Sequence, residues 1–172
     1  MATFHEIIHE HTKDFPPIPP LTSRFAIRLF QSNQFLYILH PCDYNGEIAV
    51  WFCKYEKKGE QFSLGPNSKH LITVSQFPTL FSTLETALRY LNTRNYSFYL
   101  PIDFSGVDHI SSYMTDHVTL TLSHYTYPFA MVYDMHIPYS DFQSLVPLLQ
   151  THLDDIDDSY LAQAAEAKLK IA

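Results

Sequence analysis

The strongest constraint in this 172-residue sequence is a pattern that occurs twice, 65 residues apart. In both copies a stretch of strand-forming residues leads to a serine, and an amphipathic helix pattern follows. Phe77 aligns with Phe142, and the apolar positions that follow keep the same register. The further aligned pairs are Leu80 with Leu145, Phe81 with Val146, Leu84 with Leu149 and Leu88 with Leu153. The repeat predicts two copies of a unit in which strands precede a helix.

Segments rich in aromatic and β-branched residues predict the strands of these units. The predicted strands cover residues 25–30, 35–40, 47–55, 61–64, 70–74, 96–102, 117–125 and 129–137. The predicted helices cover residues 4–13, 76–92, 141–153 and 158–169, with Ser75 and Ser140 as N-caps of the two long ones. The sequence therefore predicts an α+β fold: an antiparallel sheet with duplicated strands-then-helix units, a short N-terminal helix and a C-terminal helix.

The length of the chain predicts one compact domain. We assign residues 1–20 to the N-terminal helix and a Pro-rich strap, residues 21–95 to the first unit and residues 96–172 to the second. Apolar residues make up 46% of the chain and aromatic residues 15%, which excludes a disordered or coiled-coil protein. Four glycines are too scattered for a Gly-rich phosphate loop. No apolar run approaches the roughly 18 residues that span a membrane, so we expect no membrane partner.

An Asn-Gly dipeptide at positions 45–46 fixes the register of a hairpin, because it is the strongest two-residue turn signal. In that register Cys42 lies opposite Ala49, and Cys53 lies opposite Ile38. The two cysteines are then about 13 Å apart, which is too far for a disulfide. Two reduced thiols and an N-terminus without a signal-peptide pattern predict a cytoplasmic protein.

Both faces of this hairpin are apolar. Leu36, Ile38, Trp51 and Cys53 point one way, and Tyr37, Leu39, Val50 and Phe52 point the other way. One face can pack on the helix of its own unit, whereas the other needs a second cover. The sequence leaves three alternatives for this cover: the other repeat, a second subunit or a ligand.

The formal net charge of −7 is unevenly distributed along the chain. Residues 21–100 carry a net charge of +3, whereas residues 101–158 contain nine aspartates and no Lys or Arg. An acidic balance of this kind favours solubility. The alternative interpretation is an acidic face that meets a basic partner.

His5, Glu6 and His9 match the HExxH pattern of zinc hydrolases, in which two histidines bind the metal and the glutamate polarises its water. No third ligand follows in a metal-binding spacing. Helical periodicity places these three side chains on the solvent-exposed side of the predicted helix, with Phe4 and Ile7 on the buried side. We therefore predict a solvated helix here, and expect neither a bound metal nor a cofactor.

Histidines and aspartates also gather in the acidic segment, where they are a second candidate set for a metal. This set comprises Asp108, His109, Asp116, His117, His124, Asp134, His136 and His152. His124 lies in the apolar register of its strand, so a satisfied core histidine is the preferred interpretation. Residues 154–158 resemble a loose cation loop, but they lack the glycine and distal glutamate of an EF-hand and predict a charged turn between helices.

Aromatic residues interleaved with lysines in the first unit raise the alternative of single-stranded nucleic-acid binding. The repeated strands-then-helix layout is similar to that of single-strand binders of the PUR and whirly type, and an acidic α+β chain of this size equally resembles secretion chaperones. The acidic second half would repel a phosphate backbone, which makes nucleic acid the second choice.

The leading prediction is a non-catalytic binding or adaptor protein that recognises a protein partner through an apolar sheet face bordered by the acidic segment. A homodimer is one way to cover the second apolar face. The candidate binding residues are Tyr37, Trp51, Phe52, Lys54, Lys57 and Lys58. A single-stranded nucleic-acid binder is the alternative, and a metal-dependent hydrolase is the third choice.

Overall fold

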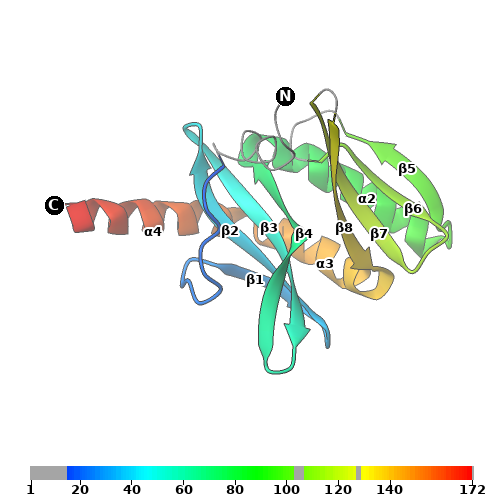
Figure 1. Cartoon of the computed structure of the whole chain (residues 1–172), viewed down its shortest axis with the longest axis horizontal. Coiled ribbons are helices and arrows are strands. Elements are labelled where there is room, and N and C mark those ends of the chain that lie inside the picture. Colours follow the sequence, from blue (N-terminus) through cyan, green and yellow to red (C-terminus); the bar gives the residue numbers. More distant parts are fainter. Residues whose placement is uncertain (1–14, 103–106, 127–128, 172) are drawn as a thin grey trace.

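The computed structural model describes residues 15–102, 107–126 and 129–171, and contains two four-stranded antiparallel sheets (Figure 1). The first sheet has the order β1-β2-β3-β4, and the second has the order β5-β6-β7-β8. The first four strands are β1 (Ile27–Gln31), β2 (Phe35–Tyr44), β3 (Glu47–Lys58) and β4 (Gln61–Thr73). The other four are β5 (Ser97–Pro101), β6 (His109–Tyr113), β7 (His117–Thr126) and β8 (Phe129–Pro138).

A helix follows each sheet, and a further helix ends the described chain. The helical elements are the short 3₁₀ turn η1 (Val74–Gln76), α2 (Phe77–Asn92), α3 (Tyr139–Thr151) and α4 (Leu153–Ile171). The prediction of an α+β fold with strands before a helix in each half is therefore confirmed. Among the described helices, none combines the length and the apolar character needed to cross a membrane. The predicted helix over residues 4–13 lies outside the described residues.

Several predicted boundaries were wrong, and each error has a local cause. The segments 61–64 and 70–74 are parts of one strand, β4, which is interrupted only by an irregularity in its pairing with β3. Strand β6 was missed because it is short and Ile110 supplies its one aliphatic side chain. Helix α2 and helix α3 begin without a side-chain capping bond, so Ser75 and Ser140 are not their caps.

Helix α4 begins at Leu153, five residues before the predicted start at 158. The acidic residues 154–158 therefore form the first turns of a helix, where carboxylates interact favourably with the helix dipole, and not a turn between helices.

The β2–β3 hairpin has the predicted register. Asn45 and Gly46 both adopt positive φ angles, 54° and 79°, as the tight turn requires. Cys42 pairs with Ala49 and Cys53 pairs with Ile38, and both cysteines are free thiols. The chain beyond this hairpin forms the long β3–β4 finger, which projects from the body (Figure 1).

One hydrophobic core joins the two halves of the molecule, because each helix contacts the sheet of the other half. Helix α2 packs on β5 and β6 of the second sheet, and α3 contacts β1 of the first sheet as well as β7 and β8. Two polar bonds reinforce this arrangement. Tyr37 Oη donates to the buried Asp141 carboxylate of α3 at 2.7 Å, and His70 Nε2 on β4 bonds to the Leu120 carbonyl of β7 at 3.0 Å.

The outer face of the first sheet is covered by the chain itself. Residues 15–26, which we call the strap segment, lie over an apolar cluster that includes Ile38, Trp51 and Tyr55. Trp51 Nε1 donates to the Pro16 carbonyl at 3.0 Å, and the Phe15 ring meets the Trp51 ring edge-on at 5.9 Å between centroids. The cover is therefore none of the three alternatives that the sequence left open.

Candidate functional site

The structure does not bring the predicted aromatic site residues onto one surface. Tyr37 and Phe52 lie on the inner face of the first sheet and are 0% and 3% exposed, as parts of the core beneath the helices. Trp51 lies on the opposite face, beneath the strap segment, and is also buried. These three side chains are positioned to stabilise the fold, and any partner would reach them only after a rearrangement.

The three predicted lysines also lie apart. Lys57 pairs with Phe62 on the outer face of the finger, whereas Lys54 and Lys58 alternate onto the other face. Lys54 is half-buried, and burial lowers its pKa. Its ammonium lies 4.3 Å from the centroid of the Phe35 ring and donates to the His136 carbonyl of β8 at 2.5 Å. Lys54 therefore stands where the first sheet meets the edge of the second.

The acidic segment does not form one continuous face, because several of its aspartates have structural roles. Asp141 is buried and bonded to Tyr37, Asp108 accepts the Ser123 N–H, and Asp134 accepts the Thr121 hydroxyl. Four more gather in the first turns of α4: Asp154, Asp155, Asp157 and Asp158.

A shallow groove of about 360 Å³ occupies the outer face of the second sheet. Two cross-strand rows form its floor. Ser111, Thr119 and His136 make one row, and His109, Thr121 and Asp134 make the next. Tyr99 and Pro101 of β5 continue these rows beyond the lining of the groove. Tyr113, His117, Ser123 and Val132 complete the lining. Alternation explains this surface, because the residues between these positions, such as Ile110, Leu120 and Met135, point into the core.

Aromatic rings flank the groove and remain open to solvent. Tyr99 is 55% exposed and lies 4.7 Å from the His109 ring, and Tyr113 is 63% exposed. The His117 and His136 rings meet edge-on at 4.5 Å. Burial, followed by the nearby His117 and Lys54, lowers the pKa of His136 and favours its neutral imidazole.

Hydrogen bonds hold the polar floor of the groove in place. Thr119 Oγ1 lies 2.9 Å from His136 Nδ1, and the Thr121 hydroxyl donates to Asp134 at 2.7 Å. The groove therefore holds hydroxyls, imidazoles and the Tyr113 phenol in a fixed arrangement, with Ser111 and Thr121 themselves buried in its floor. Such a surface suits a flat polar ligand that stacks and exchanges hydrogen bonds.

Metal ligation finds no support in the described part of the chain, where no group of three or more His, Cys, Asp or Glu side chains is arranged to hold an ion. His117 Nδ1 bonds to Asp116, and His152 Nδ1 bonds to Asp155. The HExxH residues His5, Glu6 and His9, and the side chain of His124, lie outside the described residues.

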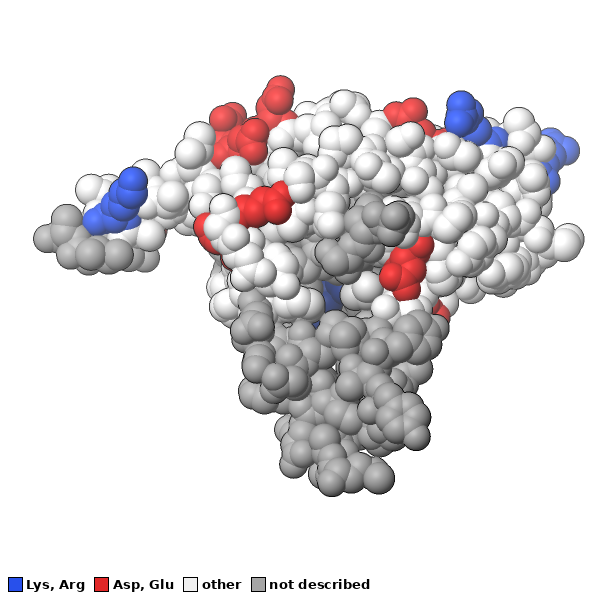
Figure 2. Space-filling model, turned by 90° about the horizontal axis from the view of Figure 1, so that it is seen from above, with Lys and Arg blue, Asp and Glu red and all other residues white. Residues whose placement is uncertain are grey.

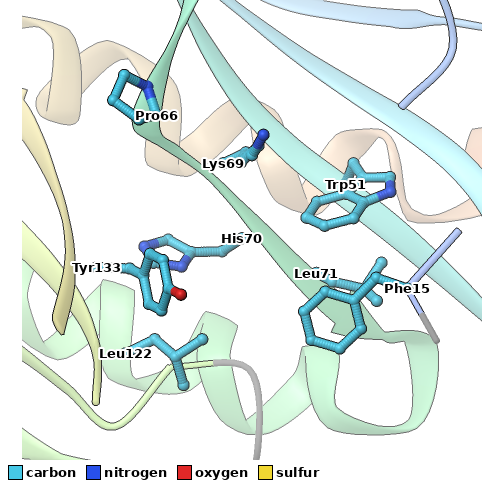
Figure 3. Close-up of a pocket in the computed structure, with 8 residues that line it drawn as sticks. All are labelled: Phe15, Trp51, Pro66, Lys69, His70, Leu71, Leu122 and Tyr133. Atoms are coloured by element: carbon cyan, nitrogen blue, oxygen red, sulfur yellow. The ribbon is translucent and has the colours of Figure 1, made fainter. Parts of the chain in front are cut away.

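A smaller cavity of about 60 Å³ lies at the joint between the two sheets (Figure 3). Its walls are mainly apolar and include Trp51, Leu122 and Tyr133. His70 also lines it, and its buried Nδ1 has no hydrogen-bond partner among the residues that the structure describes. The cavity is well below the roughly 150 Å³ that holds a benzene molecule, so we regard it as a packing gap and not as the site.

The groove was missed by sequence reasoning although part of its signal was present. Strand β7 alternates Val118, Leu120 and Leu122 with a polar set, which predicts one wet face. The tyrosines that border this face come from β5 and from β6, and β6 was not predicted.

Comparisons with protein-family models, with curated proteins and with solved structures give no match.

Proposed function

We propose that this protein is a non-catalytic binder of single-stranded nucleic acid, and that the groove of the second sheet holds the strand. The observation that carries the proposal is an open four-stranded face with exposed Tyr99 and Tyr113 beside a floor of hydroxyls and imidazoles. Exposed aromatic side chains on such a sheet stack on unpaired bases, and the polar groups beside them meet base edges.

Two features favour this alternative over an adaptor that uses an apolar sheet face. The apolar face of the first sheet is already covered by the strap segment. Val132 supplies the one aliphatic side chain among the described residues that line the groove, whereas protein-binding hot spots depend on apolar and aromatic anchors in desolvated pockets.

The charges around the groove define the kind of binding expected. Lys54 stands at the β8 edge, where it can meet a phosphate, and Asp134 is already occupied by Thr121. Because few cations border the groove, stacking should supply most of the affinity. Binding should then depend weakly on salt, with a slope of log K against log salt of about −0.7 for the single contact of Lys54 with a phosphate.

The test is fluorescence anisotropy with labelled 12-nucleotide single strands of DNA and RNA at two salt concentrations. We expect Tyr99→Ala and Tyr113→Ala each to weaken binding about 5- to 100-fold, which corresponds to the loss of one stacked base. Tyr96→Ala is the matched control, because Tyr96 is also exposed but its ring stacks on Tyr139, outside the groove.

The lysines locate the bound strand. Lys54→Gln should weaken binding, whereas the double change Lys57→Glu and Lys58→Glu on the finger should leave it within about twofold. A loss of affinity confined to the finger variant would contradict a site in the groove and indicate one on the first sheet. Absence of binding by the unchanged protein at low salt would refute the proposed function and return the adaptor interpretation to first place.

A further inference from the structure

Helix α4 extends from the body of the molecule as a projecting arm (Figure 1). One of its sides is bound to the first unit. The Ser159 hydroxyl donates to the Phe25 carbonyl at 2.6 Å, Tyr160 Oη donates to Asp43 at 3.0 Å, and Arg24 forms an ion pair with Glu166. Ile156 on the same side is buried. These contacts fix the direction in which the helix leaves the body.

The opposite side of α4 carries a stripe of exposed residues at alternating spacings of four and three. The stripe consists of Asp154, Asp158, Leu161, Ala165 and Lys168. This spacing is that of a coiled-coil seam, which keeps one line of side chains facing a partner helix. Leu161 is 62% exposed, although leucine at such a position gains stability only when it is covered.

Charge divides along the stripe. The aspartates lie where α4 meets the body and Lys168 lies toward the free end, and Figure 2 shows acidic side chains near the body and a basic one at the outer end of the arm. A second copy packed in parallel would place aspartates against aspartates. An antiparallel copy centred on residue 163 places Asp158 opposite Lys168 and Leu161 opposite Ala165, twice over.

We propose that the exposed stripe of α4 is a self-association surface, through which two copies of this chain form an antiparallel homodimer. The stripe is self-complementary in charge and in size, since the small Ala165 leaves room for Leu161 of the second copy. The contact covers only a few helical turns, so the dimer should be weak and form at micromolar or higher concentrations. The proposal is independent of nucleic-acid binding.

The test is sedimentation velocity of the full chain from about 5 to 500 µM, in low salt. We expect a monomer–dimer equilibrium that Asp158→Lys and Lys168→Asp each weaken at least tenfold. The double variant should recover most of the dimerisation, because the two changed residues face each other again in the antiparallel pair. Leu161→Asp should abolish the dimer.

Glu85→Lys on the exposed side of α2 is the control for Asp158→Lys, since it makes the same change in net charge elsewhere. Thermal melting of each variant shows whether the monomer remains folded. The proposal fails if the unchanged chain is monomeric throughout this range, if the double variant is no better than the singles, or if the control weakens the dimer equally.

Discussion

The two sheets have the same strand order and share one core, yet their outer faces are opposite in character. The first sheet presents Ile38, Trp51 and Tyr55 outward, and the strap segment covers them. The second sheet presents hydroxyls and imidazoles outward, and its groove is open. The two sheets differ in the polarity of the outward-facing residues on their central strands. An apolar sheet face must be covered, whereas a polar one can remain exposed to solvent. In this molecule the first sheet is covered on both faces, whereas the second sheet leaves the groove on its outer face.

The largest expected difference between the two faces is in stability. Trp51→Ala should lower the free energy of unfolding by about 3–5 kcal/mol, because it leaves a large cavity beneath the strap segment. Tyr113→Ala, on the open face, should change it by less than about 0.5 kcal/mol. Urea unfolding at one protein concentration measures both. Similar losses in the two variants would mean that the groove is as tightly integrated as the covered face.

The second difference is in acid sensitivity. Burial lowers the pKa of His40 and of His70 to about 4, against about 6.5 in an unfolded chain. Between these values the unfolded chain binds protons that the folded chain does not, so stability is full above pH 6.5 and decreases as the pH falls toward 4. Each histidine should contribute up to about 3 kcal/mol of this loss.

Histidine variants test whether the loss of stability at acid pH arises from the buried histidines of the first sheet. Urea unfolding between pH 7 and pH 4 should show a shallower decrease for His40→Gln than for the unchanged chain. His109→Gln, in the solvent-accessible groove, is the matched control and should retain the original slope. An equal flattening in both variants would contradict the assignment.

The smallest effect concerns one hydrogen bond on each face. Trp51→Phe keeps an aromatic ring but removes the bond to the Pro16 carbonyl, and should cost about 1 kcal/mol. Thr121→Val removes the bond from the buried Thr121 hydroxyl to Asp134, whose half-buried carboxylate can bond to water instead, and should cost less than about 0.5 kcal/mol. Urea unfolding compares the two, and a larger loss for Thr121→Val would reverse the order of the two faces.

The sequence predicted what local patterns determine. The turn at 45–46 set the register that placed Trp51 opposite His40, and the two apolar faces of the hairpin correctly required two covers. Local patterns do not specify which distant segment becomes a cover. The contact between Trp51 and Pro16 joins residues 35 positions apart, and depends on the path of the whole N-terminal segment.

The candidate site was less predictable for a related reason. The groove combines residues from the three strands β6, β7 and β8, and His109 and Tyr113 belong to a strand whose pattern is weak. The lysine cluster in the sequence drew attention to residues 54–58, but strand alternation directs these side chains to opposite faces. Residues that are close along one strand were therefore a misleading candidate site, whereas the groove is formed by residues that are close across neighbouring strands.

The packing of α2 on the sheet of the second half has a consequence for synthesis. Residues up to the end of α2 leave the ribosome with a helix whose apolar side will later pack on β5 and β6, which do not yet exist. Until α3 arrives, Tyr37 also lacks its carboxylate partner Asp141. The first half therefore remains partly folded, with the apolar side of α2 exposed, while about 60 more residues are translated. This takes several seconds. Chaperone binding to the nascent chain is expected to be strongest in this interval and to end when α3 emerges.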